Sequence, residues 1–364
     1  MDELVRLVVI LLCVPILSVS GQNAPPPQLQ PRPIGPTATP PVATDRQIML
    51  DVQVTDKSGA AVRGLQKRDF TLLDDKQPKP ILSFQALDNG AKSASDPSIE
   101  VILVVDAVNA SSQAVTYERN ELKKFLLRDG GKLALPTSLV IFTDRGTRVQ
   151  DGSSRNGNVL AELYDQYETG LRSITRSQGF YGASERLDLS LKTLTSLVAY
   201  QGKRPGRKLL IWFSPGWPIL SGPNIDLSRK DQEKFFNLIV DTSNSLRLAR
   251  VTLYSIDPLG MSDAGGFRTF YYQEFVKGVT SPGRTLPGNL ALQVLAVQSG
   301  GRVLNSSNDL TSEIAQCTAD GAAFYVISFD PARADHPNEY HALGVTIDIP
   351  GTTARTRTGY YAQP

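Results

Sequence analysis

One stretch of the chain restricts the fold more than any other: five apolar residues in a row, Val-Ile-Leu-Val-Val, lie between Glu100 and Asp106. A strand with one face in water alternates apolar and polar residues, whereas a strand covered on both faces is apolar throughout. Comparable runs end at Asp144, Ser214 and Asp257. These segments are therefore predicted to be central strands of a parallel sheet with helices on both faces.

Helical patterns separate the apolar runs. The clearest has Leu187, Leu191, Leu194 and Val198 at a spacing of three or four residues, which places them on one face of a helix. The predicted helices span 115–128, 157–168, 184–199, 228–249, 288–299 and 308–317. Strands that alternate with helices predict an α/β fold with a doubly wound, mostly parallel sheet over residues 97–317.

Both flanks of this α/β region have a β pattern. Residues 46–92 contain an alternating strand and two turns, and residues 318–364 contain three runs with strand character. Segments of roughly forty residues are too short to be stable alone without disulfides or a metal. We therefore expect the two segments to pair in one β-sandwich, into which the α/β domain is inserted. Arg355 and Arg357 should project to the same face of the last strand, and we expect that face to be solvated.

The N-terminal residues 1–20 have the features of a signal peptide. An apolar run too short to span a bilayer, which needs about 20 residues, is followed by the small residues Ser18 and Ser20 of a cleavage site. The acidic residues at positions 2 and 3 are unusual there, so a retained anchor stays open as the alternative. Residues 21–45 are rich in proline and should form an extended linker, as a spacer or as a ligand for a partner. We predict a secreted or periplasmic protein without stable membrane insertion after cleavage.

Charge and composition argue against several classes of protein. The 38 Lys and Arg residues nearly balance the 36 Asp and Glu residues, which does not suit a nucleic-acid partner. Two Cys and two His argue against a disulfide framework and a dedicated structural zinc site. Pro337 prevents a helix that would place His336 and His341 together as in zinc proteases. Cys317 lies in an apolar context and is expected in the core.

The sequence contains no assembled catalytic set. Ser214 ends a strand, but Ser-Pro-Gly is not the Gly-x-Ser-x-Gly turn of a hydrolase, and both His lie in the C-terminal β segment. No Gly-x-x-x-x-Gly-Lys loop is present to bind phosphate. We therefore predict a noncatalytic protein without a cofactor, and a secreted hydrolase is the least favoured alternative.

The order of these segments resembles that of a von Willebrand factor type A domain. The likeness is carried by Val-Ile-Leu-Val-Val-Asp106, Leu-Val-Ile-Phe-Thr-Asp144, Leu-Leu-Ile-Trp-Phe-Ser214 and Val-Thr-Leu-Tyr-Ser-Ile-Asp257, followed by Gly-Gly-Arg-Val. A closer likeness is to exported VWFA-related proteins of the acidobacterial type, which the stretches 51–59, 204–218 and 355–362 resemble. The resemblance covers the chain from residue 46 onward and implies a protein-binding or adhesion module.

The resemblance also implies a metal-ion-dependent adhesion site, built from hydroxyl and carboxylate oxygens that suit Mg²⁺. Its first element is Asp-x-Ser-x-Ser; here Asp106 is retained, but Val108 and Ala110 occupy the two Ser positions. The other side chains that could take part in a degenerate site are those of Asn109, Ser111, Ser184 and Ser214. We therefore expect no bound metal, with a divalent-metal-dependent adhesin that uses a variant site as the alternative.

Aromatic residues near the carboxyl ends of the strands are candidates for partner binding. Trp217 follows the strand that ends at Ser214 and either closes the core or anchors a partner. Residues 258–287 lack any period and should form a long surface excursion, which offers Phe267 and Tyr271. Because ligands of open α/β sheets bind outside the carboxyl ends of the strands, we predict that Trp217, Phe267 and Tyr271 contact an unidentified protein partner there.

Overall fold

The computed structural model describes residues 47–88, 99–168, 179–219, 227–260 and 271–364. The predicted signal peptide and the Pro-rich linker lie outside the described residues. Phe267 lies outside them as well. No described helix has both the length and the apolar composition needed to cross a bilayer.

Within these ranges, seven strands form one sheet in the order β11-β10-β9-β5-β6-β7, with β8 also paired to β6. The parallel strands are β5 (Ile99–Asp106), β6 (Lys132–Thr143), β9 (Arg207–Phe213), β10 (Val251–Ile256) and β11 (Val303–Leu304). The short strands β7 (Gly146–Val149) and β8 (Ser154–Asn156) run antiparallel to β6. The prediction of an α/β fold with a mostly parallel sheet is confirmed.

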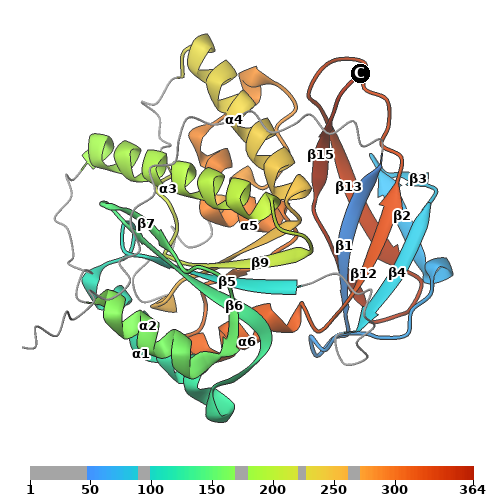
Figure 1. Ribbon diagram of the computed structural model, residues 1–364. Helices are drawn as coiled ribbons and strands as arrows, with labels where there is room; N and C mark the ends of the chain where they lie inside the picture. The colour runs from blue at the N-terminus through green and yellow to red at the C-terminus, as the bar shows by residue number, and fades with distance from the viewer. Residues whose placement is uncertain (1–46, 89–98, 169–178, 220–226, 261–270) are drawn as a thin grey trace, which may run out of the picture. The chain divides into compact units, whose positions relative to one another are not determined.

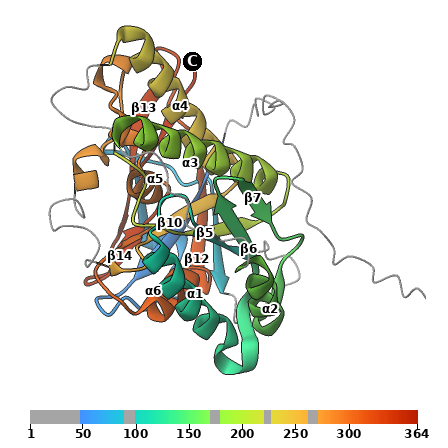
Figure 2. The same cartoon turned by 90° about the vertical axis from the view of Figure 1, so that its left-hand side faces the viewer.

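Helices cover both faces of this sheet (Figure 1). The helices on one face are α3 (Gly179–Gly202), α4 (Arg229–Leu248) and α5 (Leu292–Gln298), and those on the other are α1 (Ser112–Leu127), α2 (Gly157–Glu168) and α6 (Leu310–Ala319). Figure 2 shows the sheet between these two layers from the side. The adjacent residues Trp212 and Phe213 on β9 point into the two different apolar clusters, and both are fully buried. This is why β9 is apolar from Leu209 to Phe213.

Two further sheets contain strands from both flanks of the α/β region. Their orders are β14-β1-β12-β4 and β15-β13-β2-β3. The strands are β1 (Ile48–Thr55), β2 (Phe70–Asp74), β3 (Gln77–Lys79), β4 (Ser83–Asp88), β12 (Ala323–Phe329), β13 (Glu339–Ile347), β14 (Thr353–Arg355) and β15 (Gly359–Ala362). Val52 and Ile327 from the first sheet and Leu72 and Tyr360 from the second share one apolar cluster. Each sheet therefore depends on strands that are far apart in the sequence.

Three local features differ from the sequence prediction. The predicted strand near the C-terminus is interrupted and forms β14 and β15. The hairpin of β6 and β7 was not predicted; its turn residues are Asp144 and Arg145, and Gly146, the first residue of β7, has a φ of 127° that suits glycine. The excursion after β10 is not wholly on the surface, because its side chains Phe275 and Val279 are buried. Apolar residues without a period can fill the core when 3₁₀ turns present them, as η4 (Tyr271–Phe275) does here.

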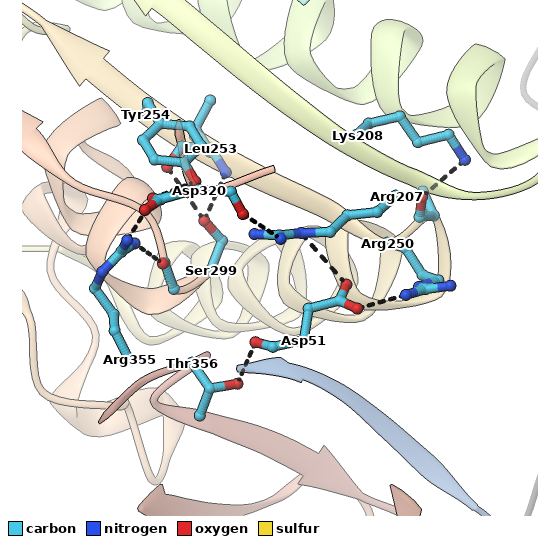
Figure 3. A network of polar contacts seen from close by, with 12 residues as sticks. Asp51, Arg207, Lys208, Arg250, Leu253, Tyr254, Ser299, Asp320, Arg355 and Thr356 are labelled. Carbon is cyan, nitrogen blue, oxygen red and sulfur yellow. Dashed lines mark hydrogen bonds and ion pairs between the residues drawn. The ribbon is translucent and has the colours of Figure 1, made fainter. Parts of the chain in front are cut away.

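A buried ionic network connects the α/β region to β1 (Figure 3). Arg207, at the first position of β9, is fully buried; its Nη1 donates to the carbonyl of Asp320 at 2.9 Å, and its Nε lies 3.7 Å from Asp51 Oδ2. The Arg207 guanidinium also lies 4.5 Å from the ring centre of Phe324. Arg250, just before β10, pairs with the other oxygen of Asp51. One carboxylate of β1 thus contacts two guanidiniums, at the amino ends of β9 and β10.

Asp320, which follows α6, is the second centre of this network (Figure 3). Its carboxylate pairs with Arg302 and Arg355 and accepts the Tyr254 hydroxyl at 2.7 Å. Burial opposes its ionisation, but Arg355 and Arg302 hold the pKa of Asp320 below its ordinary value. The expected solvated face is therefore wrong: Arg355 pairs with Asp320, and Arg357 is buried. A strand pattern alone does not indicate that another element covers the strand.

Replacing Asp51 with alanine should destabilise the protein by about 3–5 kcal/mol, because removing one partner of a buried ion pair leaves uncompensated charge. Here two guanidiniums lose that partner, and Arg207 has no access to solvent. Equilibrium unfolding in urea measures the loss. Asp330→Ala, at an exposed position, is the matched control and should change the free energy of unfolding by less than about 0.5 kcal/mol. Equal effects of the two substitutions would contradict a structural role for the network.

Candidate functional site

The carboxyl edge of the parallel sheet has the topology of a ligand-binding edge. Strands β5 and β9 are parallel neighbours, but the chain leaves β5 for α1 on one face and leaves β9 for α4 on the other. Connections that diverge in this way leave a crevice at the carboxyl ends of the two strands. Asp106 ends β5 and Ser214 follows β9, so both lie at this point.

The Asp106 carboxylate is fully buried and surrounded by N–H donors. Oδ1 accepts the backbone N–H groups of Val108 and Asn109, each at 2.9 Å. Oδ2 accepts the Asn109 side-chain amide at 2.8 Å and the Trp212 indole N–H at 2.9 Å. Burial raises the pKa of Asp106, although these hydrogen bonds act in the opposite direction. The carboxylate therefore fixes the turn after β5 and orients Trp212.

The neighbouring polar residues continue this packing. The Asn109 amide also donates to Ser190 Oγ on α3 at 2.9 Å, which links the turn after β5 to that helix. Ser111 Oγ accepts the Ala114 backbone N–H and so caps α1.

Glu118, on α1, is fully buried, and neither carboxylate oxygen has a hydrogen-bond partner among the described residues. Burial, aided by repulsion from Asp106, raises the pKa of Glu118 well above its ordinary value.

These residues do not fit a divalent metal at Asp106. Both of its oxygens face N–H protons, which repel a cation, and the side chains of Val108 and Ala110 contain no ligand atom. The Ser111 hydroxyl already caps a helix. Asn109 Oδ1 accepts no hydrogen bond from the described residues, but Mg²⁺ is usually bound through carboxylates. The two remaining candidates, Ser184 and Ser214, lie on α3 and after β9, where no described carboxylate is paired with them.

The structure corrects the placement of Trp217. Its side chain is only 3% exposed and packs edge-to-face on Trp212, with ring centres 5.1 Å apart. The preceding loop is held by Ser214, whose Oγ accepts the Gly216 backbone N–H at 3.2 Å, and by Gln293, whose amide donates to Pro215. Trp217 therefore closes the core of the α3–α4 layer and presents no ring face to a partner.

Exposed aromatic side chains remain at this edge. Tyr271 is 44% exposed and packs edge-to-face on Phe275, which belongs to an apolar cluster with Ile219 of the loop after β9. Tyr181, in the first turn of α3, is 85% exposed. The hydrophobic pattern of the sequence does not indicate Tyr181, because an exposed residue contributes nothing to a hydrophobic period. The feature of the sequence that could have indicated an exposed tyrosine is its position between Gly179 and Gly182, at the start of a helix.

A second group of acidic residues lies where β10 ends. Asp257 follows β10, Asp309 caps α6 by accepting the Ser312 backbone N–H, and Glu313 is buried one turn further along α6. Burial, together with the charges of Asp257 and Asp309, raises the pKa of Glu313 to about 7. This carboxyl group therefore changes charge near neutral pH.

Comparison with known proteins identifies no family. No protein-family model matches the chain, and no curated protein matches it. Among solved structures, it is similar to an aerotolerance-related membrane protein from Bacteroides fragilis, at 10% identity over 62% of this chain and 98% of that one, with a TM-score of 0.32. It is also similar to manganese-loaded TRAP protein from Plasmodium vivax, at 11% identity over 78% and 100%, with a TM-score of 0.33.

A third similar structure is the PilB minor pilin from Streptococcus sanguinis, at 13% identity over 64% of each chain, with a TM-score of 0.34. This chain thus spans about two thirds of the length of the pilin structure. At such low TM-scores the similarities carry no argument about function. What this edge of the sheet does has to be inferred from its own residues.

Trp217→Ala should destabilise the fold by about 3–5 kcal/mol, the usual effect of removing a large buried aromatic side chain. Thermal or urea unfolding measures this loss. Tyr181→Ala is the control, because that ring is 85% exposed, and its effect should stay below about 0.5 kcal/mol. A stable Trp217→Ala protein would mean that the ring does not belong to the core.

Glu313→Gln should stabilise the protein more at pH 8 than at pH 5. The folded-state pKa is raised to about 7 from an ordinary value of 4.5, so the native state holds its proton more tightly than the unfolded chain does. The stabilisation that Glu313 contributes by keeping its proton in the folded state is fully present below pH 4.5 and is lost as the pH rises through 7. The gain from Gln should therefore grow by about 1–3 kcal/mol between the two pH values, as measured by urea unfolding. Glu185→Gln, at an exposed position, is the control, and its effect on the free energy of unfolding should not differ between the two pH values. An equal gain in stability at both pH values for Glu313→Gln would contradict the raised pKa of Glu313.

Proposed function

We propose that this chain is a noncatalytic, exported protein-binding or adhesion module: a von Willebrand A-like domain inserted into a β-sandwich made by its two terminal segments. Its partner binds at the carboxyl edge of the parallel sheet, without a divalent metal. The observation that carries this proposal is the combination of a carboxylate already saturated by N–H donors with exposed tyrosines in the first turn of α3 and in η4.

The two edges of the sheet differ in what they leave accessible. At the amino edge, Arg207 and Arg250 are engaged with Asp51 of β1, so that side is covered by the chain itself. Since the strands are parallel, their carboxyl ends lie on the opposite side. Tyr181 and Tyr271 contribute rigid aromatic surface to that side, and tyrosine is enriched among residues that dominate protein interfaces.

Metal-independent binding is supported by the Asp106 environment. A divalent ion would have to displace the Trp212 indole or the backbone N–H groups that hold the carboxylate, and the turn after β5 would lose its fixed shape. Burial also disfavours the charged form of Asp106. The partner therefore meets a preformed protein surface, whose contacts come from side chains around the crevice.

The same geometry gives a hydrolase little support. Ser214 is buried, and its hydroxyl is engaged with the Gly216 backbone. The two histidines that could act as a base lie in or beside β13. That strand packs with β1 and β2 in a different apolar cluster from the strands beside Ser214. No described residue activates the Ser214 hydroxyl.

Site-specific photocrosslinking tests this proposal. A photoreactive phenylalanine analogue at Tyr181 or Tyr271 should crosslink the partner in envelope extracts of the source organism, while the same probe at Tyr200 should not. Tyr200 lies at the other end of α3, about 28 Å from Tyr181 at 1.5 Å per residue, and is 41% exposed, so it is a matched tyrosine control on the same helix.

The metal requirement is measured in the same experiment. Crosslinking should be unchanged by EDTA. Asp106→Asn should weaken crosslinking only to the extent that the substitution loosens the turn after β5. Capture that is lost in EDTA and restored by Mg²⁺ or Mn²⁺ would favour a metal-dependent adhesin. Equal capture at Tyr181, Tyr271 and Tyr200 would remove the proposed surface.

A further inference from the structure

A second polar centre lies far from the sheet edge described above, where β13 meets the turn between β2 and β3. His341 Nδ1, on β13, lies 2.9 Å from Asp75 Oδ2 and 3.3 Å from Asp74 Oδ1. The donor atoms of the three side chains all lie within 4.8 Å of one another. One imidazole nitrogen and two carboxylates therefore converge on one point, although the histidine is more than 260 residues away from the aspartates in the sequence.

The Asp74 carboxylate has an unused oxygen in this centre. Its side chain is 1% exposed, and Oδ1 accepts no hydrogen bond from any described residue even though it faces the imidazole. A buried carboxylate oxygen normally has a partner, and a missing one suggests an unseen ion or water. Because the atom is aimed at His341 and lies beside Asp75, the missing partner belongs between these groups.

Surrounding contacts hold the three side chains in place. The Tyr360 hydroxyl donates to Asp74 Oδ2 at 3.0 Å, and the Tyr360 ring stacks on the imidazole. Asp75 Oδ1 accepts the Ala342 backbone N–H at 2.8 Å. Asp75 and Lys76 have φ values of 49° and 66°, so they form a two-residue hairpin turn of fixed geometry. Each carboxylate thus uses one oxygen for support and directs the other toward His341.

The geometry points to a divalent-metal site formed by Asp74, Asp75 and His341, with Zn²⁺ as the ion that suits it best. Zinc binds imidazole nitrogen and carboxylate oxygen at about 2.0–2.2 Å, so neighbouring ligand atoms in a tetrahedral site are about 3.4 Å apart. His341 Nδ1 lies 2.9 Å from the Asp75 oxygen and 3.3 Å from the Asp74 oxygen, so these atoms need to move apart only slightly to admit the ion.

The donor set and its exposure favour zinc over Mg²⁺ or Ca²⁺. Imidazole is a common ligand of Zn²⁺ and other transition metals, whereas Mg²⁺ and Ca²⁺ prefer oxygen throughout. Asp75 is 50% exposed, so water can supply a fourth ligand on that side. Lys79 Nζ, 3.8 Å from Asp74 Oδ2, is the nearby positive charge that binding has to overcome. The bound ion would join the β2–β3 hairpin to the C-terminal segment.

The competing arrangement is a His341 that contacts both aspartates directly and needs no metal. The two arrangements differ in stoichiometric zinc binding, so metal titration separates them. The full chain, prepared without a polyhistidine tag and stripped with EDTA, is titrated with ZnCl₂ in a calorimeter. One ion per chain is expected, and the melting temperature should rise with zinc concentration.

Matched variants locate the ion. Asp75→Asn, at a half-exposed turn position where asparagine is well tolerated, should weaken zinc binding at least tenfold while the protein stays folded, and His341→Gln should abolish it. His336→Gln changes the other histidine of the chain, which is exposed, and should leave binding unchanged. Titration with Co²⁺ adds a spectroscopic readout, because its visible absorption reports the coordination number.

Two results would overturn the site. The first is the absence of stoichiometric zinc binding at neutral pH, which would leave the direct contact of His341 with the two aspartates as the explanation. The second is zinc binding that survives Asp75→Asn and His341→Gln but is lost in His336→Gln, which would place the ion on the surface. Neither result affects the proposed partner surface, because the two sites share no residue.

Discussion

The tertiary structure depends on a buried cation: Arg207, which has no access to solvent and lies at the first position of β9, a strand whose residues are all buried. A buried guanidinium is tolerable only when it is paired and hydrogen-bonded. Asp51 of β1 provides the charge, and the carbonyl that follows α6 provides the hydrogen bond. The α/β region and the strands of the N-terminal segment are therefore held in one relative position by a contact that neither part can satisfy alone.

This contact also covers the amino edge of the sheet. The amino ends of β9 and β10 are engaged with Asp51, and the second carboxylate of the network, Asp320, binds Arg355 of the C-terminal segment. We therefore place the proposed partner surface at the carboxyl edge. There the Asp106 carboxylate is used to hold the turn after β5 and the Trp212 indole. The described residues on this side also include the exposed Tyr181 and Tyr271.

Burial and pairing determine the protonation of the acidic side chains. Glu118 lies in an apolar layer without a hydrogen-bond partner among the described residues, and its pKa is raised well above the ordinary range. Asp320 is also buried, but two guanidiniums lower its pKa. The difference is the presence of positive charge, because desolvation penalises the ionised form of both.

The residue pattern was enough to predict the central strands, because a strand buried on both faces has to be apolar throughout, as at Val101–Val105 and Leu209–Phe213. The helix with Leu187, Leu191 and Leu194 was found in the same way, since those residues pack on one face of the sheet. The pattern also indicated that Asp106 lacks the hydroxyl neighbours of a metal site. These features depend only on local sequence and on the periods of strands and helices.

Exposure and long-range pairing were not predictable in this way. Trp217 is buried because it meets Trp212 across the edge of the sheet, and Arg355 is covered because Asp320 lies against it. His341 reaches Asp74 and Asp75 only because β13 pairs with β2. What the sequence determined by itself was the type of each central element, which follows from the repeat of its apolar residues. Only the tertiary structure decided which side chains meet, because strand pairing joins residues whose separation along the chain leaves no periodic signal.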